Sequence, residues 1–160
     1  MNKILILSNT AFSIEKFREH YLSKIYNYDF LIYTPNLKPK LKKKYKHIKT
    51  RKFRSKNLFD DFYQLYKILK KNKTTEIIVY SYKYQLIISL LKKIFKIKLN
   101  IISIIAGLGS FHLGNVFKKN FLYLVSKFIV NSSKYIICIN PQDLDYFKKL
   151  SQEKKILSIT

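Results

Sequence analysis

The chain has 160 residues, and 48% of them are hydrophobic, which is enough to build the core of one ordinary domain and excludes a wholly disordered protein. The formal net charge is +23, but nearly all the basic residues are lysines, so base-specific recognition of nucleic acid, which relies on the arginine fork, is poorly supported. A single cysteine, Cys138, excludes an internal disulfide, and its apolar surroundings predict a buried core residue rather than a nucleophile.

Short apolar runs alternate with longer helical patterns along the chain. Strands are predicted at Lys3 to Leu7, Phe30 to Tyr33, Ile48 to Phe53, Glu76 to Tyr80, Leu99 to Ile104, Tyr135 to Ile139 and Ile156 to Ile159. Helices are predicted behind an N-cap at Ser13, over about Leu58 to Lys71, Tyr84 to Lys96 and Lys119 to Asn131, and from Pro141 onward. This alternation predicts an α/β domain, namely a Rossmann-like three-layer α/β/α domain with a mostly parallel sheet.

Two helix starts carry capping signals. Asn57 and Asp60 have the spacing of a cap pair, and Asn140 is the predicted cap before Pro141. The helix over residues 119 to 131 is expected to turn one apolar face inward, made of Phe121, Leu124, Val125 and Phe128.

The rare glycines stand close together. Gly107, Gly109 and Gly114 fall within eight residues, in a composition that otherwise disfavours glycine. Such a cluster indicates positive φ angles or a close approach to a ligand, although an ordinary loop remains the alternative. A dinucleotide fingerprint is not supported, because the third glycine is missing and the loop follows the fifth strand.

Four loops follow strand ends and are expected to meet at one edge of the sheet, where ligands of parallel sheets bind: Ser8 to Ser13, Tyr80 to Tyr84, Ala106 to Gly114 and Asn140 to Asp143. The first loop opens a helix whose free N–H groups suit an anion or a sugar hydroxyl, but turn and cap chemistry explains it equally well.

No metal or cofactor is expected. The histidines, His20, His47 and His112, are far apart in sequence, and no phosphate-binding glycine motif of the NTPase type is present. The apolar run at the N-terminus is too short for a signal peptide, and Ile101 to Phe111 is too short for a transmembrane helix, so a cytoplasmic location is expected.

Four motifs occur in an order and spacing that resemble the acceptor domain of family 4 glycosyltransferases: residues 3 to 10 (KILILSNT), Phe17-Arg18, residues 105 to 110 (IAGLGS) and residues 140 to 144 (NPQDL). The likeness covers nearly the whole chain and is greatest to bacterial members that extend lipid-linked saccharides for capsule, O-antigen or glycoprotein glycans.

This resemblance implies a two-domain GT-B enzyme that transfers a sugar from a nucleotide-sugar with retention and without a metal. The N-terminal half of such enzymes binds the acceptor, here a lipid-linked saccharide or polysaccharide precursor. The implied acceptor-binding residues are Asn9, Thr10, Ser13, Arg18, Gly107, Leu108, Gly109, Ser110 and Asn140.

The chain departs from the family pattern at two points. Many relatives have a histidine where this chain has Ala106, so no catalytic residue is assigned. The resemblance also ends near Thr160, so residues 1 to 160 are expected to be the N-terminal domain, with the nucleotide-sugar held by a C-terminal domain or partner subunit outside the chain.

Lysine clusters favour an anionic membrane as partner. Lys42, Lys43 and Lys44 lie in a segment, Lys38 to Lys56, with eleven basic residues and no acidic one. A second predicted cluster consists of Lys92, Lys93 and Lys96. We therefore expect a peripheral protein on the inner face of the cell membrane. The alternative is a non-enzymatic basic module that binds anionic membrane or nucleic acid.

Overall fold

The computed structural model describes residues 3–8, 29–34, 48–52, 57–72, 74–107, 116–151 and 156–158. The chain divides into two units, Met1–Val79 and Tyr80–Thr160, and each is described by itself. The helix predicted behind Ser13 and the lysines at 42 to 44 lie outside the described residues.

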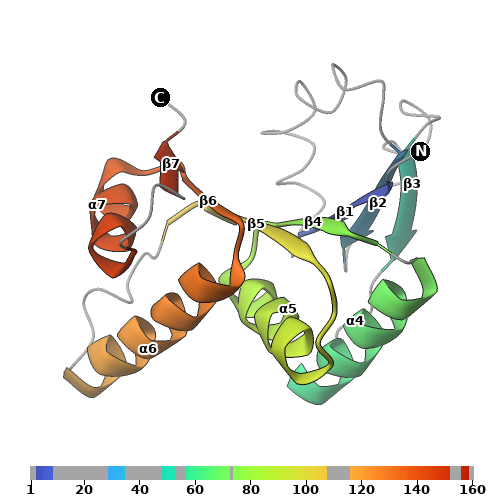
Figure 1. Ribbon diagram of the computed structural model, residues 1–160, viewed down its shortest axis with the longest axis horizontal. Helices are drawn as coiled ribbons and strands as arrows, with labels where there is room; N and C mark the ends of the chain where they lie inside the picture. The colour runs from blue at the N-terminus through green and yellow to red at the C-terminus, as the bar shows by residue number, and fades with distance from the viewer. Residues whose placement is uncertain are drawn as a thin grey trace. The chain divides into compact units, whose positions relative to one another are not determined.

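The first unit holds strands β1 (Lys3–Leu7), β2 (Asp29–Thr34), β3 (Ile48–Lys52) and β4 (Glu76–Val79), with helix α4 (Leu58–Asn72) before β4. The strands run parallel in the order β3-β2-β1-β4 (Figure 1). Leu5, Ile6 and Leu7 are all buried, as expected of an inner parallel strand with both faces covered.

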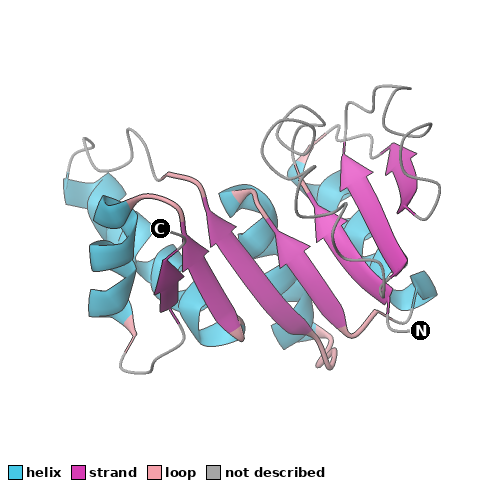
Figure 2. Ribbon diagram, turned by 90° about the horizontal axis from the view of Figure 1, so that it is seen from above, coloured by secondary structure: helices cyan, strands magenta, loops and turns pink. Residues whose placement is uncertain are grey.

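The second unit alternates helices and strands: α5 (Tyr82–Ile94), β5 (Asn100–Ile105), α6 (Val116–Ser132), β6 (Tyr135–Cys138), α7 (Pro141–Leu150) and β7 (Ile156–Ser158). β5 pairs with β6 and β6 with β7, each time in parallel (Figure 2). Because α6 and α7 connect parallel neighbours, each strand-helix-strand segment is a βαβ unit. The predicted α/β class is confirmed: the chain has a Rossmann-like α/β fold with a parallel sheet.

Helix capping follows the sequence prediction. The backbone N–H of Asp60 donates to Asn57 Oδ1 at 2.8 Å, and the N–H of Gln142 donates to Asn140 Oδ1 at 3.0 Å. Each bond satisfies one of the N–H groups that a helix leaves unpaired in its first turn. The sequence therefore located the starts of α4 and α7.

The predicted inward face of α6 is wrong. Phe121 is 63% exposed and Leu124 is 64% exposed, and Val125 and Phe128 are half-buried. The buried face instead comprises Leu122, Ser126, Ile129 and Val130.

The reason for this orientation is that α6 carries apolar residues on two opposite faces. Leu122 and Val130 pack in one cluster with Ile105 of β5 and Ile136 of β6. The small Ser126 lies between them in the helix, and its hydroxyl forms a hydrogen bond with that of Tyr82 and accepts one from Tyr146, which a phenylalanine could not do. This face is therefore the one that packs inward.

Candidate functional site

The candidate site in the second unit lies where β5 and β6 end. Ile105 and Cys138 are register partners in these parallel strands, and the N–H of Ile139 donates to the carbonyl of Ile105 at 3.0 Å. The loops that begin at Ala106 and at Asn140 therefore leave adjacent strand ends, as the sequence predicted for these two loops. Ala106, Gly107 and Asn140 are all exposed at this edge.

Gly107 has the backbone conformation that the sequence predicted. Its φ is +130°, in the region that side chains with a β-carbon rarely adopt. A β-carbon built at this position would meet no heavy atom within 4 Å. The glycine requirement therefore comes from the backbone angle and not from crowding.

Asn140 has a structural task at the same edge. Its side chain caps α7, and Pro141 occupies the first turn, where a missing N–H does no harm. Asp143 follows in that turn and is only 2% exposed. Asn140 therefore caps α7 in the structure, and its role in acceptor binding stays a prediction.

The loop predicted at Tyr80 to Tyr84 is shorter than expected, because α5 already begins at Tyr82. The hydroxyl of Tyr82 lies 2.7 Å from Ser126 Oγ of α6, and the hydroxyl of Tyr146 of α7 donates to the same Ser126 Oγ at 3.4 Å. Burial raises the pKa of Tyr82 to about 12. Tyr82 thus connects α5 to α6 through this hydrogen bond and does not belong to the loop at the strand ends.

Cys138 is fully buried at the end of β6 and packs with Ile105 and Phe147. Burial, with a smaller contribution from the charge of Asp143, raises the pKa of its thiol to about 12. A reactive cysteine has a lowered pKa and some exposure, so the prediction of a core residue is confirmed.

Most of the predicted acceptor residues lie outside the described part of the chain: Asn9, Thr10, Ser13, Arg18, Leu108, Gly109 and Ser110. Ser8, which precedes them at the end of β1, is buried. Their roles stay predictions.

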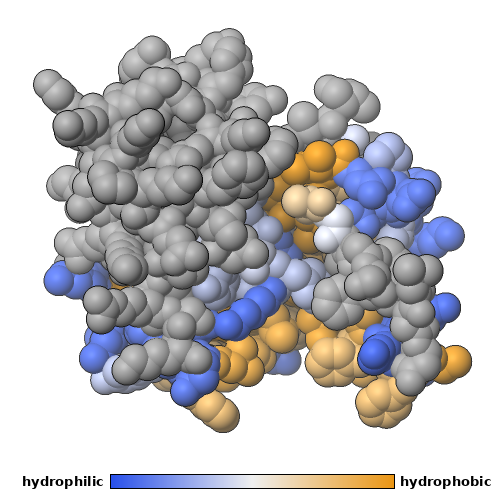
Figure 3. Space-filling view, turned by 180° about the vertical axis from the view of Figure 1, so that it is seen from behind, coloured by the Kyte–Doolittle hydropathy of each residue, from blue (hydrophilic) through white to orange (hydrophobic). Residues whose placement is uncertain are grey.

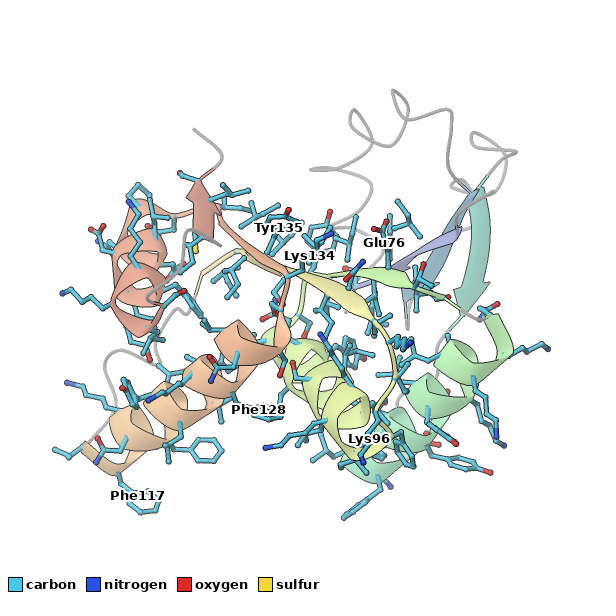
Figure 4. The ribbon with its side chains drawn as sticks, viewed as in Figure 1. Glu76, Lys96, Phe117, Phe128, Lys134 and Tyr135 are labelled. Carbon is cyan, nitrogen blue, oxygen red and sulfur yellow. The ribbon has the colours of Figure 1, made fainter. Side chains whose placement is uncertain are left out.

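The predicted lysine cluster of α5 does come together in space. The ammonium of Lys92 donates to the carbonyl of Ser132 on α6 at 2.8 Å, and that of Lys93 lies over the ring of Phe128. Lys96 follows directly after the helix (Figure 4). The aromatic part of this surface was not predicted, because helix periodicity placed Phe128 on the inward face.

Within the described ranges, His, Cys, Asp and Glu side chains form no group of three that could hold a metal ion. In the same part of the chain, every helix is too short or too polar to span a bilayer.

No protein-family model matches the sequence, and no curated protein matches it either. Solved structures are similar in fold. A sucrose-phosphate synthase from Thermosynechococcus elongatus matches with a TM-score of 0.73 at 11% identity, over 99% of this chain and 88% of the compared chain. HepE from Anabaena, in complex with UDP and glucose, matches with a TM-score of 0.67 at 10% identity, over 99% of this chain and 44% of its own.

The lipopolysaccharide outer core galactosyltransferase WaaB matches with a TM-score of 0.60 at 15% identity, over 98% of this chain and 44% of its own. The chain thus spans less than half the length of the HepE and WaaB chains. These neighbours are GT-B glycosyltransferases, and at such low identity the likeness concerns the fold alone. The chain has the Rossmann-like α/β fold that forms one half of a GT-B structure.

Proposed function

We propose that this chain is the acceptor-binding half of a glycosyltransferase that transfers a sugar from a nucleotide-sugar to a lipid-linked saccharide or polysaccharide precursor. The observation that carries the proposal is the extent of the fold match. Nearly all of this chain aligns with less than half of HepE, a protein described in complex with UDP and glucose. A donor-binding domain or partner subunit outside this chain completes the enzyme in this proposal.

The described edge supports the proposal in two ways. Parallel α/β sheets bind ligands beyond the carboxyl ends of their strands, and residues 106, 107 and 140 are exposed there. Gly107 has no side chain, and the space that a β-carbon would occupy has no heavy atom within 4 Å. The motif resemblance to family 4 enzymes, which includes residues 105 to 110, points to the same loop.

Support for a lipid-linked acceptor comes from the likeness to WaaB, which its name describes as acting on the lipopolysaccharide outer core. Such an acceptor is anchored in a membrane, so the enzyme that uses it works at a bilayer surface. The lysines around the end of α5 suit that location, because an anionic surface attracts each nearby lysine by about 1 kcal/mol. We propose a peripheral position on the inner face of the membrane.

Calorimetric titration tests whether this chain binds the acceptor and not the nucleotide-sugar. The purified chain is titrated with lipid-linked oligosaccharides in detergent and, separately, with UDP-glucose and other nucleotide-sugars. We expect saturable binding of a lipid-linked oligosaccharide, no binding of nucleotide-sugar, and no sugar transfer by the chain alone, because transfer needs the donor held at a defined distance from the acceptor. Binding or turnover of a nucleotide-sugar by this chain would contradict the proposal.

A further inference from the structure

The outward face of α6 is apolar, although the opposite face of this helix already packs in the core of the unit. Val116, Phe117, Phe121 and Leu124 are 75%, 82%, 63% and 64% exposed. At about 100° per residue, Phe117, Phe121, Leu124 and Phe128 fall within about 60° of one another. They lie on the side opposite to the buried Leu122 and Ser126. Figure 4 shows Phe117 pointing away from the strands at the start of α6.

Burying a serine while exposing two phenylalanines and a leucine reverses the usual order of residues between core and surface. Scattered apolar residues on a surface need no explanation, but a continuous row along one helix marks an interaction site. Figure 3 shows apolar side chains standing out at the lower right, where α6 lies.

A basic hollow continues this row at its C-terminal end. The hollow has a volume of about 580 Å³, and its lining includes Phe128 and the lysines Lys92, Lys93, Lys96 and Lys98. Phe128 belongs to both the row and the hollow, and the ammonium of Lys93 lies 5.5 Å from the centroid of its ring. The two features are therefore one surface, formed by α5 and α6 of the same unit (Figure 1).

Every charged side chain that lines the hollow is a lysine. Residues 77 to 142 include nine lysines and no aspartate or glutamate. A second copy of the chain is a poor occupant, because a two-fold contact would place these lysines against one another. A nucleic acid would suit the lysines, but aliphatic groups such as Leu124 and Val116 gain little against a phosphate backbone.

We propose that the outward face of α6, together with the lysine-lined hollow, is a docking surface for an anionic lipid bilayer. Phe117, Phe121 and Leu124 enter the boundary between headgroups and acyl chains, and the hollow binds the phosphate of an anionic headgroup. Lysines suit such a border because their stems pack on apolar surface while the ammonium reaches the headgroups. This inference rests on the membrane location in the proposed function, and it names the surface responsible.

Vesicle co-sedimentation tests the surface with matched pairs of variants of the full chain. Phe121→Ser with Leu124→Ser removes the apolar row, and Phe59→Ser is its control, since Phe59 is 85% exposed on α4. Lys93→Gln with Lys96→Gln removes charge at the hollow, and Lys148→Gln with Lys149→Gln is its control on α7. All these side chains are exposed, so unchanged circular dichroism melting is expected of every variant.

We expect the unaltered chain to bind vesicles that contain phosphatidylglycerol and not vesicles of phosphatidylcholine alone. Each test variant should weaken binding by about tenfold or more, and each control by about twofold or less. Equal losses in test and control variants would overturn the inference, as would equal binding to neutral vesicles, no vesicle binding, or RNA binding that is tighter and lost in the same variants.

The acceptor titration in detergent separates this inference from the proposed function. If both test variants still bind vesicles and the chain binds a lipid-linked oligosaccharide saturably in detergent, the inference about the α6 surface is contradicted. The glycosyltransferase proposal is then unaffected. If both test variants lose vesicle binding and the unaltered chain binds no lipid-linked oligosaccharide, the α6 surface is supported and the glycosyltransferase proposal is contradicted.

Discussion

The ammonium group of Lys93 on α5 lies 5.5 Å from the ring centroid of Phe128 on α6. This distance is within the range of a cation–π contact. It depends on α6 turning its phenylalanine row outward, so that the end of α5 and the outward face of α6 meet. The contact therefore links the basic cluster predicted from the sequence to the apolar face that the sequence analysis assigned to the core.

Lys96 occupies a backbone position that normally favours glycine. Its φ is +50°, and the N–H of Ile97 donates to the carbonyl of Lys92 at 3.2 Å, which closes α5 with a Schellman motif. We predict that Lys96→Gly raises the free energy of unfolding by about 0.5 to 1 kcal/mol, because glycine enters this conformation without the β-carbon penalty. Urea denaturation measures the change.

The same substitution should weaken binding to anionic vesicles, because it removes a lysine from the hollow. Lys148→Gly, within α7, is the control and should lower stability, since glycine is unfavourable inside a helix by about 1 kcal/mol. A loss of stability in Lys96→Gly as large as in Lys148→Gly would disprove the C-cap assignment.

Asn140 has a capping contact in the structure and a predicted acceptor role, and two substitutions separate these roles. Asn140→Ala should lower the free energy of unfolding by about 1 kcal/mol, because the N–H of Gln142 loses its acceptor. Asn140→Asp keeps a capping oxygen and should retain stability. Asn131→Ala on the exposed side of α6 should cause no loss.

Thermal melting gives the stability of these variants, and calorimetry with a lipid-linked oligosaccharide gives their acceptor affinity. If Asn140→Asp is stable but binds the acceptor more weakly, the amide contacts the acceptor. If it binds with unchanged affinity, Asn140 is a cap only.

The positions of the strands were predictable because parallel strands are short, buried apolar runs. Ile77 and Val79 of β4 are both buried, for example, and the sequence placed this strand from residue 76. The caps at Asn57 and Asn140 were also predictable, since capping is a local property of the chain.

The orientation of α6 could not be predicted in the same way. Two apolar faces compete on this helix, and the choice depends on Tyr82 and Tyr146, which reach Ser126 from α5 and α7. Helix periodicity reveals that a face is apolar but not which partner covers it. A signal in the sequence was Ser126, which lies in the middle of the face formed by Leu122, Ile129 and Val130. A small polar residue there indicates close packing and a polar contact.

Gly107 should resist replacement by an L-amino acid. At a φ of +130°, Gly107→Ala should lower the free energy of unfolding by about 1 kcal/mol or more, although no atom obstructs the new methyl group. D-alanine introduced by chemical ligation is the matched control, because positive φ is ordinary for a D-residue. Equal destabilisation by both residues would indicate crowding and not backbone conformation.

Stability should fall in alkaline solution through Tyr82 and Cys138. The pKa of Tyr82 is raised from 10.0 to about 12 and that of Cys138 from 9.0 to about 12, in both cases mainly by burial. The folded state therefore keeps protons that the unfolded state releases. The contribution of Cys138 is complete below pH 9.0 and that of Tyr82 below pH 10.0, and both decline as the pH rises toward about 12.

Urea denaturation of the unaltered chain and of Tyr82→Phe tests this dependence. Tyr82→Phe should be less stable at neutral pH, because it loses the contact with Ser126, and the difference should shrink above pH 10.0. A difference that stays constant across that range would show that Tyr82 titrates normally in the folded protein.

Photo-crosslinking tests the central claim most directly, because it reports where an acceptor lies on this chain. The probe is a lipid-linked oligosaccharide with a diazirine on its terminal sugar, and peptide mass spectrometry locates the label. We expect label in peptides that contain residues 8 to 13 or 106 to 114, and we expect unlabelled oligosaccharide to compete it away. Label confined to other peptides, or label that excess oligosaccharide does not displace, would contradict an acceptor site at these strand ends.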